Sequence, residues 1–175
     1  MKIFGIGLPK TCTSSVSRAM KILGYTVSHD KRASTPGHTI NQANKVDFIS
    51  GAFCSAIYAK LLKTYPNGKF IYTERPLEEW LKSCEYWWDN RRGCPHWRRA
   101  IFGITNFDKA VFTEKYYSHK NACKALVPAQ QILIASVTET EDELLWRQLC
   151  SFTGKNIPGV PFPWLNSQSR KELRT

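Results

Sequence analysis

The segment Phe4–Arg18, FGIGLPKTCTSSVSR, contains the pattern that decides the fold. Apolar residues lead into a turn with glycine and proline, and Lys10 then stands among hydroxyl and thiol side chains. Apolar residues follow at helical spacing: Val16, Ala19, Met20 and Leu23. This order predicts a strand, a turn and a helix, with Thr13 and Ser14 as N-cap or first-turn residues.

A turn between a strand and a helix N-terminus is a natural anion site. Unpaired backbone N–H groups and the helix dipole both favour negative charge there. Lys10 adds a full positive charge, and hydroxyl groups add further donors: Thr11, Thr13, Ser14 and Ser15. The segment therefore predicts a phosphate-binding loop.

The two common nucleotide loops do not fit this segment. The triphosphate pattern G-x-x-x-x-G-K-[ST] needs glycine where the chain has Phe4 and Pro9. It also needs a metal-binding acid after a further strand, but QILIASV is followed by Thr138. The third glycine of G-x-G-x-x-G would fall at Lys10. A magnesium-dependent kinase or ATPase and a dinucleotide site are both disfavoured.

Strands and helices alternate along the rest of the chain. Short apolar runs predict strands at 2–6, at 69–73 and in the 130s, and amphipathic patterns predict helices at 13–23, 52–65, 76–88, 106–126 and 141–152. Residues 28–45 are expected to form a loop, 89–105 an irregular insertion, and 167–175 a flexible tail. The pattern favours one three-layer α/β/α domain over residues 1–175, with a mainly parallel central sheet.

Composition narrows the function class. The net charge of +11 favours polyanionic partners such as nucleic acid, anionic glycans or a phosphorylated small molecule. No apolar run approaches the ~20 residues of a membrane span, and the N-terminus lacks a secretory h-region, so a cytoplasmic protein is expected. The six cysteines are scattered, which predicts reduced thiols and no metal site.

Two segments carry a family resemblance. GIGLPKTCTSSVSRAMKILGY (5–25) resembles the 5′-phosphosulfate loop of sulfotransferases that use 3′-phosphoadenosine 5′-phosphosulfate (PAPS). KFIYTERPLEEWLKS (69–83) resembles their 3′-phosphate site, with Arg75 at a strand end and Ser83 on the next helix. Arg75 and Ser83 can converge on one phosphate, which the guanidinium grips with two donors. Three later segments resemble the family in order: 116–126, 132–152 and 154–166.

The resemblance implies a P-loop-like sulfotransferase fold and a metal-independent transfer of the sulfuryl group to a hydroxyl or amine. PAPS would be the donor and 3′-phosphoadenosine 5′-phosphate (PAP) the product. Lys10 would stabilise the charge that develops during transfer, and Arg75 and Ser83 would bind the 3′-phosphate. The loop lining the 5′ end would consist of Pro9, Lys10, Thr11, Cys12, Thr13 and Ser14.

The general base is less well marked. The family segment D-x-x-x-D-x-P corresponds here to residues 47–53, where Asp47 remains but Gly51 and Phe53 replace the second Asp and the Pro. His119 lies in a matching Y-x-x-H segment, so Asp47 and His119 are the catalytic candidates. Cys12 stands where the family loop has glycine, and a side chain there implies strain if the backbone needs positive φ.

Simpler roles remain open for each of these residues. Lys10 is solvated in an ordinary capped helix, Arg75 pairs with Glu78 or Glu79, Asp47 caps a turn, and His119 packs in the core. For the whole chain, the alternative is a PAP-binding module that acts as an interaction protein through its basic surface. Nucleic-acid binding is a lesser alternative, supported by the charge and the Arg/Trp run at 87–99. The acceptor is expected to contact residues 28–45 and 89–105.

Overall fold

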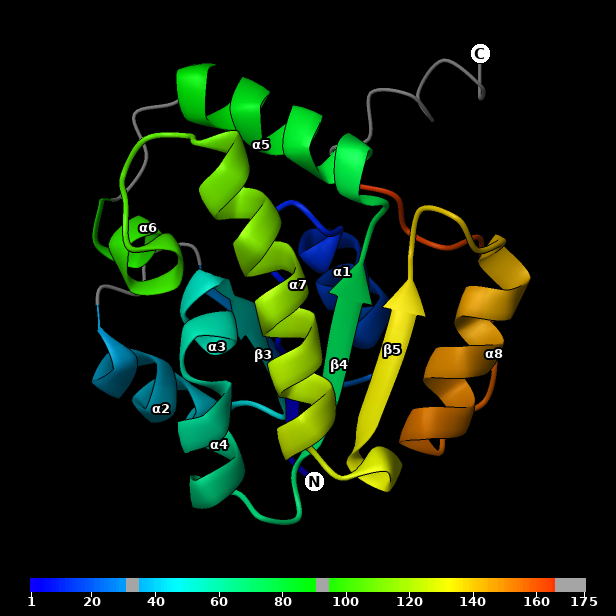
Figure 1. Cartoon of the computed structure of the whole chain (residues 1–175). Coiled ribbons are helices and arrows are strands. Elements are labelled where there is room, and N and C mark those ends of the chain that lie inside the picture. The colour runs from blue at the N-terminus through cyan, green and yellow to red at the C-terminus, as the bar shows by residue number, and fades with distance from the viewer. Residues whose placement is uncertain (31–34, 91–94, 166–175) are drawn as a thin grey trace.

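The structure is a computed structural model that describes residues 1–30, 35–90 and 95–165. Its centre is a five-stranded parallel sheet in the order β2-β3-β1-β4-β5 (Figure 1). The strands are β1 Ile3–Gly5, β2 Val27–Asp30, β3 Phe48–Gly51, β4 Lys69–Glu74 and β5 Ile132–Ser136. The helices are α1 Thr13–Ile22, α2 Pro36–Lys45, α3 Ala52–Ala56, α4 Tyr58–Thr64, α5 Leu77–Asn90, α6 Pro95–Phe102, α7 Lys109–Leu126 and α8 Asp142–Thr153.

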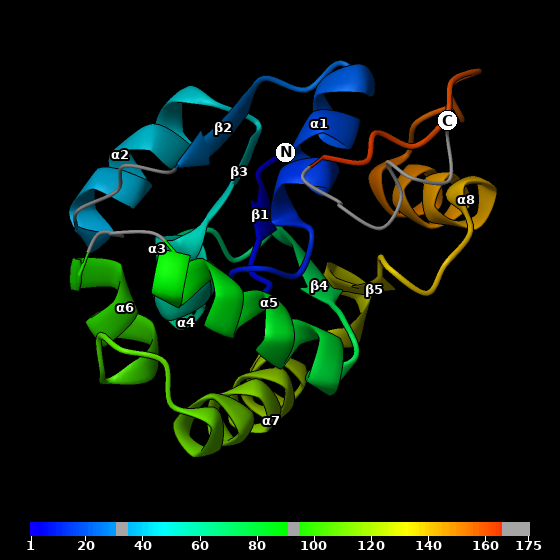
Figure 2. The same ribbon diagram turned by 90° about the horizontal axis from the view of Figure 1, so that it is seen from above.

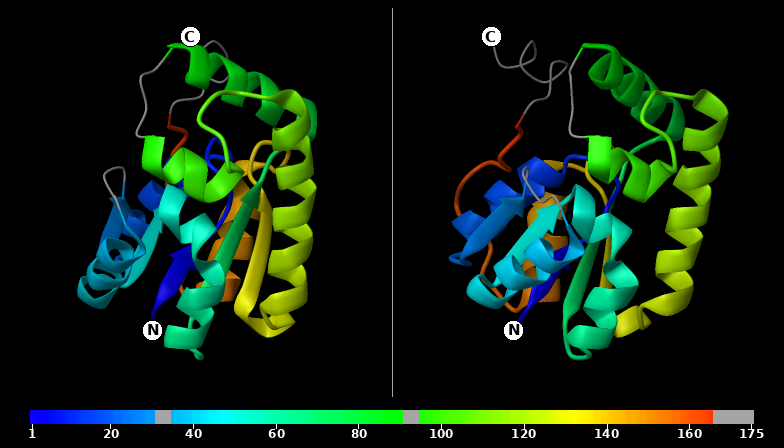
Figure 3. Two further views of the ribbon diagram at one scale, coloured as in Figure 1. Left: turned by 60° about the vertical axis from the view of Figure 1, so that its left-hand side comes forward. Right: turned by 90° about the vertical axis from the view of Figure 1, so that its left-hand side faces the viewer.

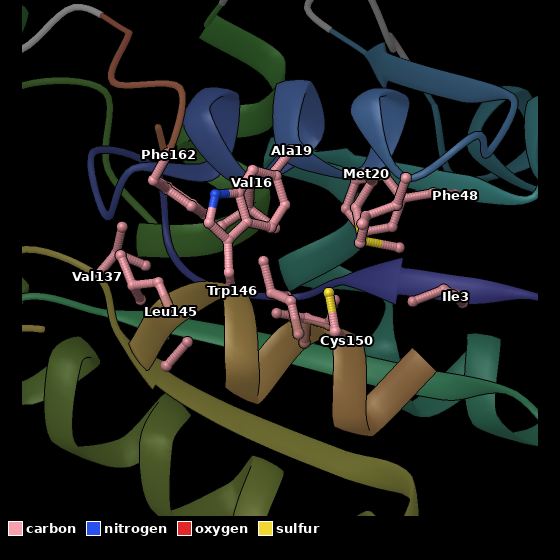
Figure 4. Close-up of a cluster of buried hydrophobic side chains, with 14 residues drawn as sticks. Ile3, Val16, Ala19, Met20, Phe48, Val137, Leu145, Trp146, Cys150 and Phe162 are labelled. Atoms are coloured by element: carbon pink, nitrogen blue, oxygen red, sulfur yellow. The ribbon is translucent and has the colours of Figure 1, made fainter. Parts of the chain in front are cut away.

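Helices cover both faces of the sheet. Ile3, Phe48 and Ile71 pack in one apolar cluster with side chains of α1 and α8 (Figure 4). Their sequence neighbours Phe4, Ile49 and Phe70 pack in another, with α2, α3, α4 and α7. Side chains of a strand alternate between its faces, so these short apolar strands hold a helical layer on each side. The predicted three-layer α/β/α fold is confirmed.

Helix α5 follows β4 and lies at the carboxyl ends of the strands, beyond their tips, as the views from the side and from above show (Figures 2 and 3). A third cluster joins α5 to the β1 loop, α6 and α7 through Leu8, Trp80, Trp88, Phe102 and Phe112. A cluster of mainly aromatic side chains therefore lies at the carboxyl edge of the sheet.

The expectation of a loop over 28–45 was wrong for most of that segment. Residues up to Asp30 form edge strand β2, and α2 begins at Pro36 with Thr35 as its N-cap, whose side chain accepts from the His38 N–H. Proline is tolerated in a first turn because its missing N–H has no intrahelical partner there. Strand β3, before the predicted helix at 52–65, was not foreseen either.

Two further boundaries differ from the predictions. The segment 89–105 is not irregular throughout, because α6 occupies Pro95–Phe102. The helix expected at 52–65 is divided at Ile57, whose φ of −118° separates α3 from α4. The expected tail at 167–175 and residues 31–34 and 91–94 lie outside the described residues.

Candidate functional site

The loop after β1 is held tightly against β4. A Cβ atom at Gly7 would lie 2.0 Å from Thr73 Oγ1, so only glycine fits this approach. Thr11 Oγ1 donates to the Leu8 carbonyl at 2.7 Å and accepts from Thr73 Oγ1 at 2.7 Å. Because its proton is used within the loop and Thr11 is buried, the hydroxyl of Thr11 fixes the loop's shape instead of facing a ligand.

The backbone around Thr11 has the shape of an anion-binding turn. Lys10 and Cys12 have positive φ values, 74° and 65°, and Cys12 is the N-cap of α1 without a side-chain cap bond. Backbone turns of this kind gather N–H groups into a concavity that binds anions. The N–H groups of Thr13 and Ser14 add to it because the first turn of a helix lacks intrahelical acceptors. That turn contains no acidic residue.

Helix α5 supports the loop from the other side. The Trp80 indole Nε1 donates to the Pro9 carbonyl at 2.8 Å. The Lys10 Nζ lies 5.8 Å from the centroid of the Trp87 ring, within the range of a cation–π contact. Pro9 and Lys10 are therefore positioned by side chains that come from α5.

Arg75 provides a second cation at the end of β4, the strand beside β1. Its Nε lies 3.0 Å from Glu79 Oε2, which is the ion pair that the sequence left open as an alternative. Glu79 and Ser83 stand four residues apart on α5 and so share one face of that helix. The Arg75 guanidinium thus reaches the face of α5 that carries Ser83.

The two cations lie near a common residue. Burial raises the pKa of the Cys84 thiol, and the charges of Lys10 and Arg75 both oppose that rise. Cys84 is fully buried in α5, one residue after Ser83. Both cations therefore lie against α5, Lys10 near Trp87 and Arg75 near Glu79.

Asp47 is not part of this arrangement. It precedes β3, whose first residue Phe48 pairs with Ile3, so it lies at the amino end of the sheet. The loop with Lys10 lies at the carboxyl end of β1. The Asp47 carboxylate accepts from the Thr26 backbone N–H at 2.9 Å and from its hydroxyl at 2.5 Å, which holds its pKa below the usual range. Asp47 closes a turn at the amino end of the sheet, so the structure does not bring it to the loop with Lys10.

His119 also has a structural environment. It is buried in α7, where its Nε2 donates to the Ile6 carbonyl at 2.9 Å. Its ring packs against Tyr58 and Tyr72. Burial lowers its pKa to about 4, so the imidazole is neutral at pH 7. Because α7 covers the sheet face opposite α1, His119 does not meet α1, whose N-terminus is the predicted anion site.

A different histidine does meet that helix. His29, near the end of β2, has its Nε2 3.0 Å from Ser14 Oγ and its Nδ1 2.7 Å from Ser50 Oγ. Ser17 of α1 joins the same group, with its Oγ 2.7 Å from Ser50 Oγ. The sequence prediction missed His29 because it assigned that segment to a loop. Recognising VSHD as a short edge strand would have put His29 at the carboxyl edge.

Among residues 1–30, 35–90 and 95–165, no three His, Cys, Asp or Glu side chains group closely enough to hold a metal ion. The helices in the same part of the chain are all too short or too polar to cross a membrane.

Comparison with known proteins shows the family and the fold of the chain. The family model described as "Sulfotransferase domain" matches residues 41–171, which include Arg75 and Ser83 but begin after the Lys10 loop. A crystal structure of a sulfotransferase from Alicyclobacillus acidocaldarius matches with a TM-score of 0.65 and 13% identity, over 98% of this chain and 89% of that one. A search of curated protein sequences returned no significant match. Because the family model covers well over half of the chain, the protein belongs to the sulfotransferase-domain family.

Proposed function

We propose that this protein transfers the sulfuryl group from PAPS to an acceptor hydroxyl or amine, without a metal ion. The observation that carries the proposal is the pair of cations on neighbouring strand ends. Lys10 follows β1 and Arg75 follows the neighbouring strand β4, and both contact α5, Lys10 at Trp87 and Arg75 at Glu79. A donor with phosphate groups at two ends of an adenosine needs two separated anion sites, which matches this pair.

The proposed roles follow from the position of each group. The N–H groups of Thr13 and Ser14 and the ammonium of Lys10 would hold the 5′-phosphosulfate, with Pro9 and Cys12 forming the turn. Thr11 would contribute through its backbone, since its hydroxyl bonds to Leu8. Arg75 and Ser83 would hold the 3′-phosphate.

Lys10 would also carry the main electrostatic contribution to the rate. As the acceptor attacks sulfur, the bond between sulfur and the 5′-phosphate oxygen breaks, and negative charge grows on that oxygen. Removing one charged or hydrogen-bonding contact to such a developing charge commonly lowers the rate by roughly 10²–10³. A fixed ammonium and backbone dipoles need no metal ion to supply this stabilisation.

A PAP-binding module with little catalysis is the second candidate. The positions of Asp47 and His119 favour it, because neither carboxylate nor imidazole meets the N-terminus of α1. Such a module would act as an interaction protein through the basic surface implied by the net charge of +11. Its partners would be acidic proteins or anionic glycans, with nucleic acid a weaker choice.

Transfer of labelled sulfate from PAPS separates these candidates. Acceptors would include simple alcohols, phenols, amines and anionic glycans, measured with EDTA present. The enzyme predicts labelled product with at least one acceptor and a drop of about 10²–10³ in rate for Lys10→Ala. Binding of PAP with no labelled product from any acceptor would instead establish the binding module.

A further inference from the structure

We propose that His29 is the general base of this site, accepting the proton of the acceptor hydroxyl at its Nε2 atom. The assignment rests on the proposed sulfuryl transfer. It concerns a residue outside both segments that had suggested catalytic candidates, and it gives the reaction a proton acceptor that Asp47 and His119 do not provide.

Sheet register brings His29 to the edge where the anion loop begins. His29 of β2 pairs with Ser50 of β3, and Ser50 pairs with Gly5 of β1. These three positions form a row across adjacent parallel strands: Gly5 is the last residue of β1, and His29 and Ser50 are each one residue before the end of their strand. Asp47 lies on the same strand as Ser50 but at its amino end. The row therefore puts His29 on the correct edge of the sheet, and Asp47 on the wrong one.

Hydrogen bonding fixes the orientation of the imidazole. Ser17 Oγ donates to the Thr13 carbonyl at 2.7 Å, which uses its only proton. Ser50 Oγ, 2.7 Å from Ser17 Oγ, then donates to Ser17 and accepts from His29 Nδ1 at 2.7 Å. In this series of hydrogen bonds, the hydroxyls of Ser50 and Ser17 each donate one bond and accept one, and the last acceptor is the Thr13 carbonyl. The series assigns the proton of the neutral ring to Nδ1 and leaves Nε2 as the acceptor atom.

Nε2 of His29 faces the N-terminal turn of α1, where the proposed phosphate site lies. Nε2 lies 3.0 Å from the Oγ of Ser14, a first-turn residue whose N–H belongs to the proposed phosphate site. Both His29 and Ser14 are only partly buried, in contrast to His119. When the Ser14 hydroxyl turns to donate to the donor's phosphate, it leaves Nε2, and the O–H of the sulfuryl acceptor takes its place as the hydrogen-bond donor to Nε2.

The step balances as a group transfer. The acceptor oxygen forms a bond to sulfur, and its proton passes to Nε2. The bond between sulfur and the 5′-phosphate oxygen breaks, and the electron pair leaves with PAP. The imidazolium that forms is stabilised by its Nδ1–H bond to Ser50. No oxidant, reductant or metal ion takes part.

The variant His29→Asn tests this role directly. An Asn amide N–H can replace Nδ1–H in the bond to Ser50, but nothing replaces Nε2. We expect PAP to bind within about twofold of wild type, while sulfate transfer from PAPS to an aliphatic alcohol falls by roughly 10²–10⁴. Transfer to 4-nitrophenol should fall far less, since a substantial fraction of that phenol is already ionised at neutral pH and the phenolate needs no base. Asp47→Asn, which changes the rejected carboxylate, should transfer to both acceptors at the wild-type rate.

The outcomes separate the base from the function. An unchanged alcohol rate in His29→Asn, or equal losses with the alcohol and 4-nitrophenol, overturns the assignment of His29 while sulfuryl transfer stands. A wild-type protein that binds PAP but releases sulfate to no alcohol, phenol or water overturns both proposals. Loss of PAP binding in His29→Asn would also overturn the base, because it would make His29 a donor-binding residue.

Discussion

His119 shows how a histidine in a matching sequence segment can be a core residue. Its Nε2 binds the Ile6 carbonyl, and burial lowers its pKa to about 4. The unfolded chain takes up the same proton near pH 6.5. Because the unfolded state binds more protons between these values, the stability contributed by neutral His119 is complete above about pH 6.5 and is lost as pH falls toward 4.

The variant His119→Gln tests this linkage. Glutamine keeps an N–H donor for Ile6 but does not titrate. Between pH 6.5 and 4, the wild-type free energy of unfolding should fall relative to that of the variant, with a slope of up to about 1.4 kcal/mol per pH unit. Urea unfolding at several pH values measures both. Parallel curves for the two proteins would contradict a neutral, buried His119.

Single residues could be predicted where their chemistry is tied to local order. Lys10 was identifiable because a lysine between a strand and a helix N-terminus has few other uses, and Arg75 because it ends a buried strand. The hydrogen bonds of the Thr11 hydroxyl could not be predicted, because they depend on the close approach of the loop to β4 at Gly7. His29 depended on the register of β2 with β3, which is a long-range property that no local pattern encodes.

At the level of elements, an ion pair at the start of α5 occupies Arg75, so a phosphate must compete with Glu79 for the guanidinium. Glu79 holds the guanidinium at 3.0 Å, with side-chain exposures of 24% for Arg75 and 53% for Glu79. Exposed pairs spaced i,i+4 on a helix contribute only about 0.3–0.5 kcal/mol. A phosphate can therefore displace Glu79, but it must then bind close to a carboxylate.

Glu79→Gln should strengthen PAP binding by about two- to fivefold, because it removes a carboxylate that competes with the 3′-phosphate for Arg75. The interaction of two unit charges at contact distance in water is about 1 kcal/mol. Binding of AMP, which lacks the 3′-phosphate, should change little. Glu78→Gln is the matched control, since it makes the same charge change one residue earlier but pairs with Lys109 at 3.5 Å. Calorimetric titration with PAP and with AMP measures the dissociation constants of the wild type and of both variants. Weaker PAP binding in Glu79→Gln would contradict the phosphate role of this face of α5.

Element prediction succeeded where apolar periodicity was strong and failed where polar residues interrupted it. Strands β1, β4 and β5 read as apolar runs. Strand β2 is a short polar edge strand, VSHD, and β3 ends in Ser50 and Gly51, so both lacked that signal. Pro36 and Gly37 suggested a loop, but the Thr35 cap makes that segment the start of α2. Strands β2 and β3 form because they pair with neighbouring strands that are distant in the sequence, and local apolar periodicity does not show such contacts.

The whole molecule joins parts that are far apart in the chain. The β1 loop, the end of β4 and α5 make the proposed donor site, and the end of β2 adds His29 from the opposite half of the sheet. Parallel strands put all their carboxyl ends at one edge, where α5 covers them. The family model identifies a sulfotransferase domain, and the distant structural match shows the overall fold that the sequence had predicted.

Thermal unfolding with PAP measures the central claim most directly. Saturating PAP at about 100 times its Kd should stabilise the wild type by roughly 2.7 kcal/mol and raise Tm by a few degrees. The shift should be the same with EDTA or magnesium, smaller with ATP, and reduced in both Lys10→Ala and Arg75→Ala. No shift with PAP, or a full shift that survives both substitutions, would contradict a donor site that spans the ends of β1 and β4.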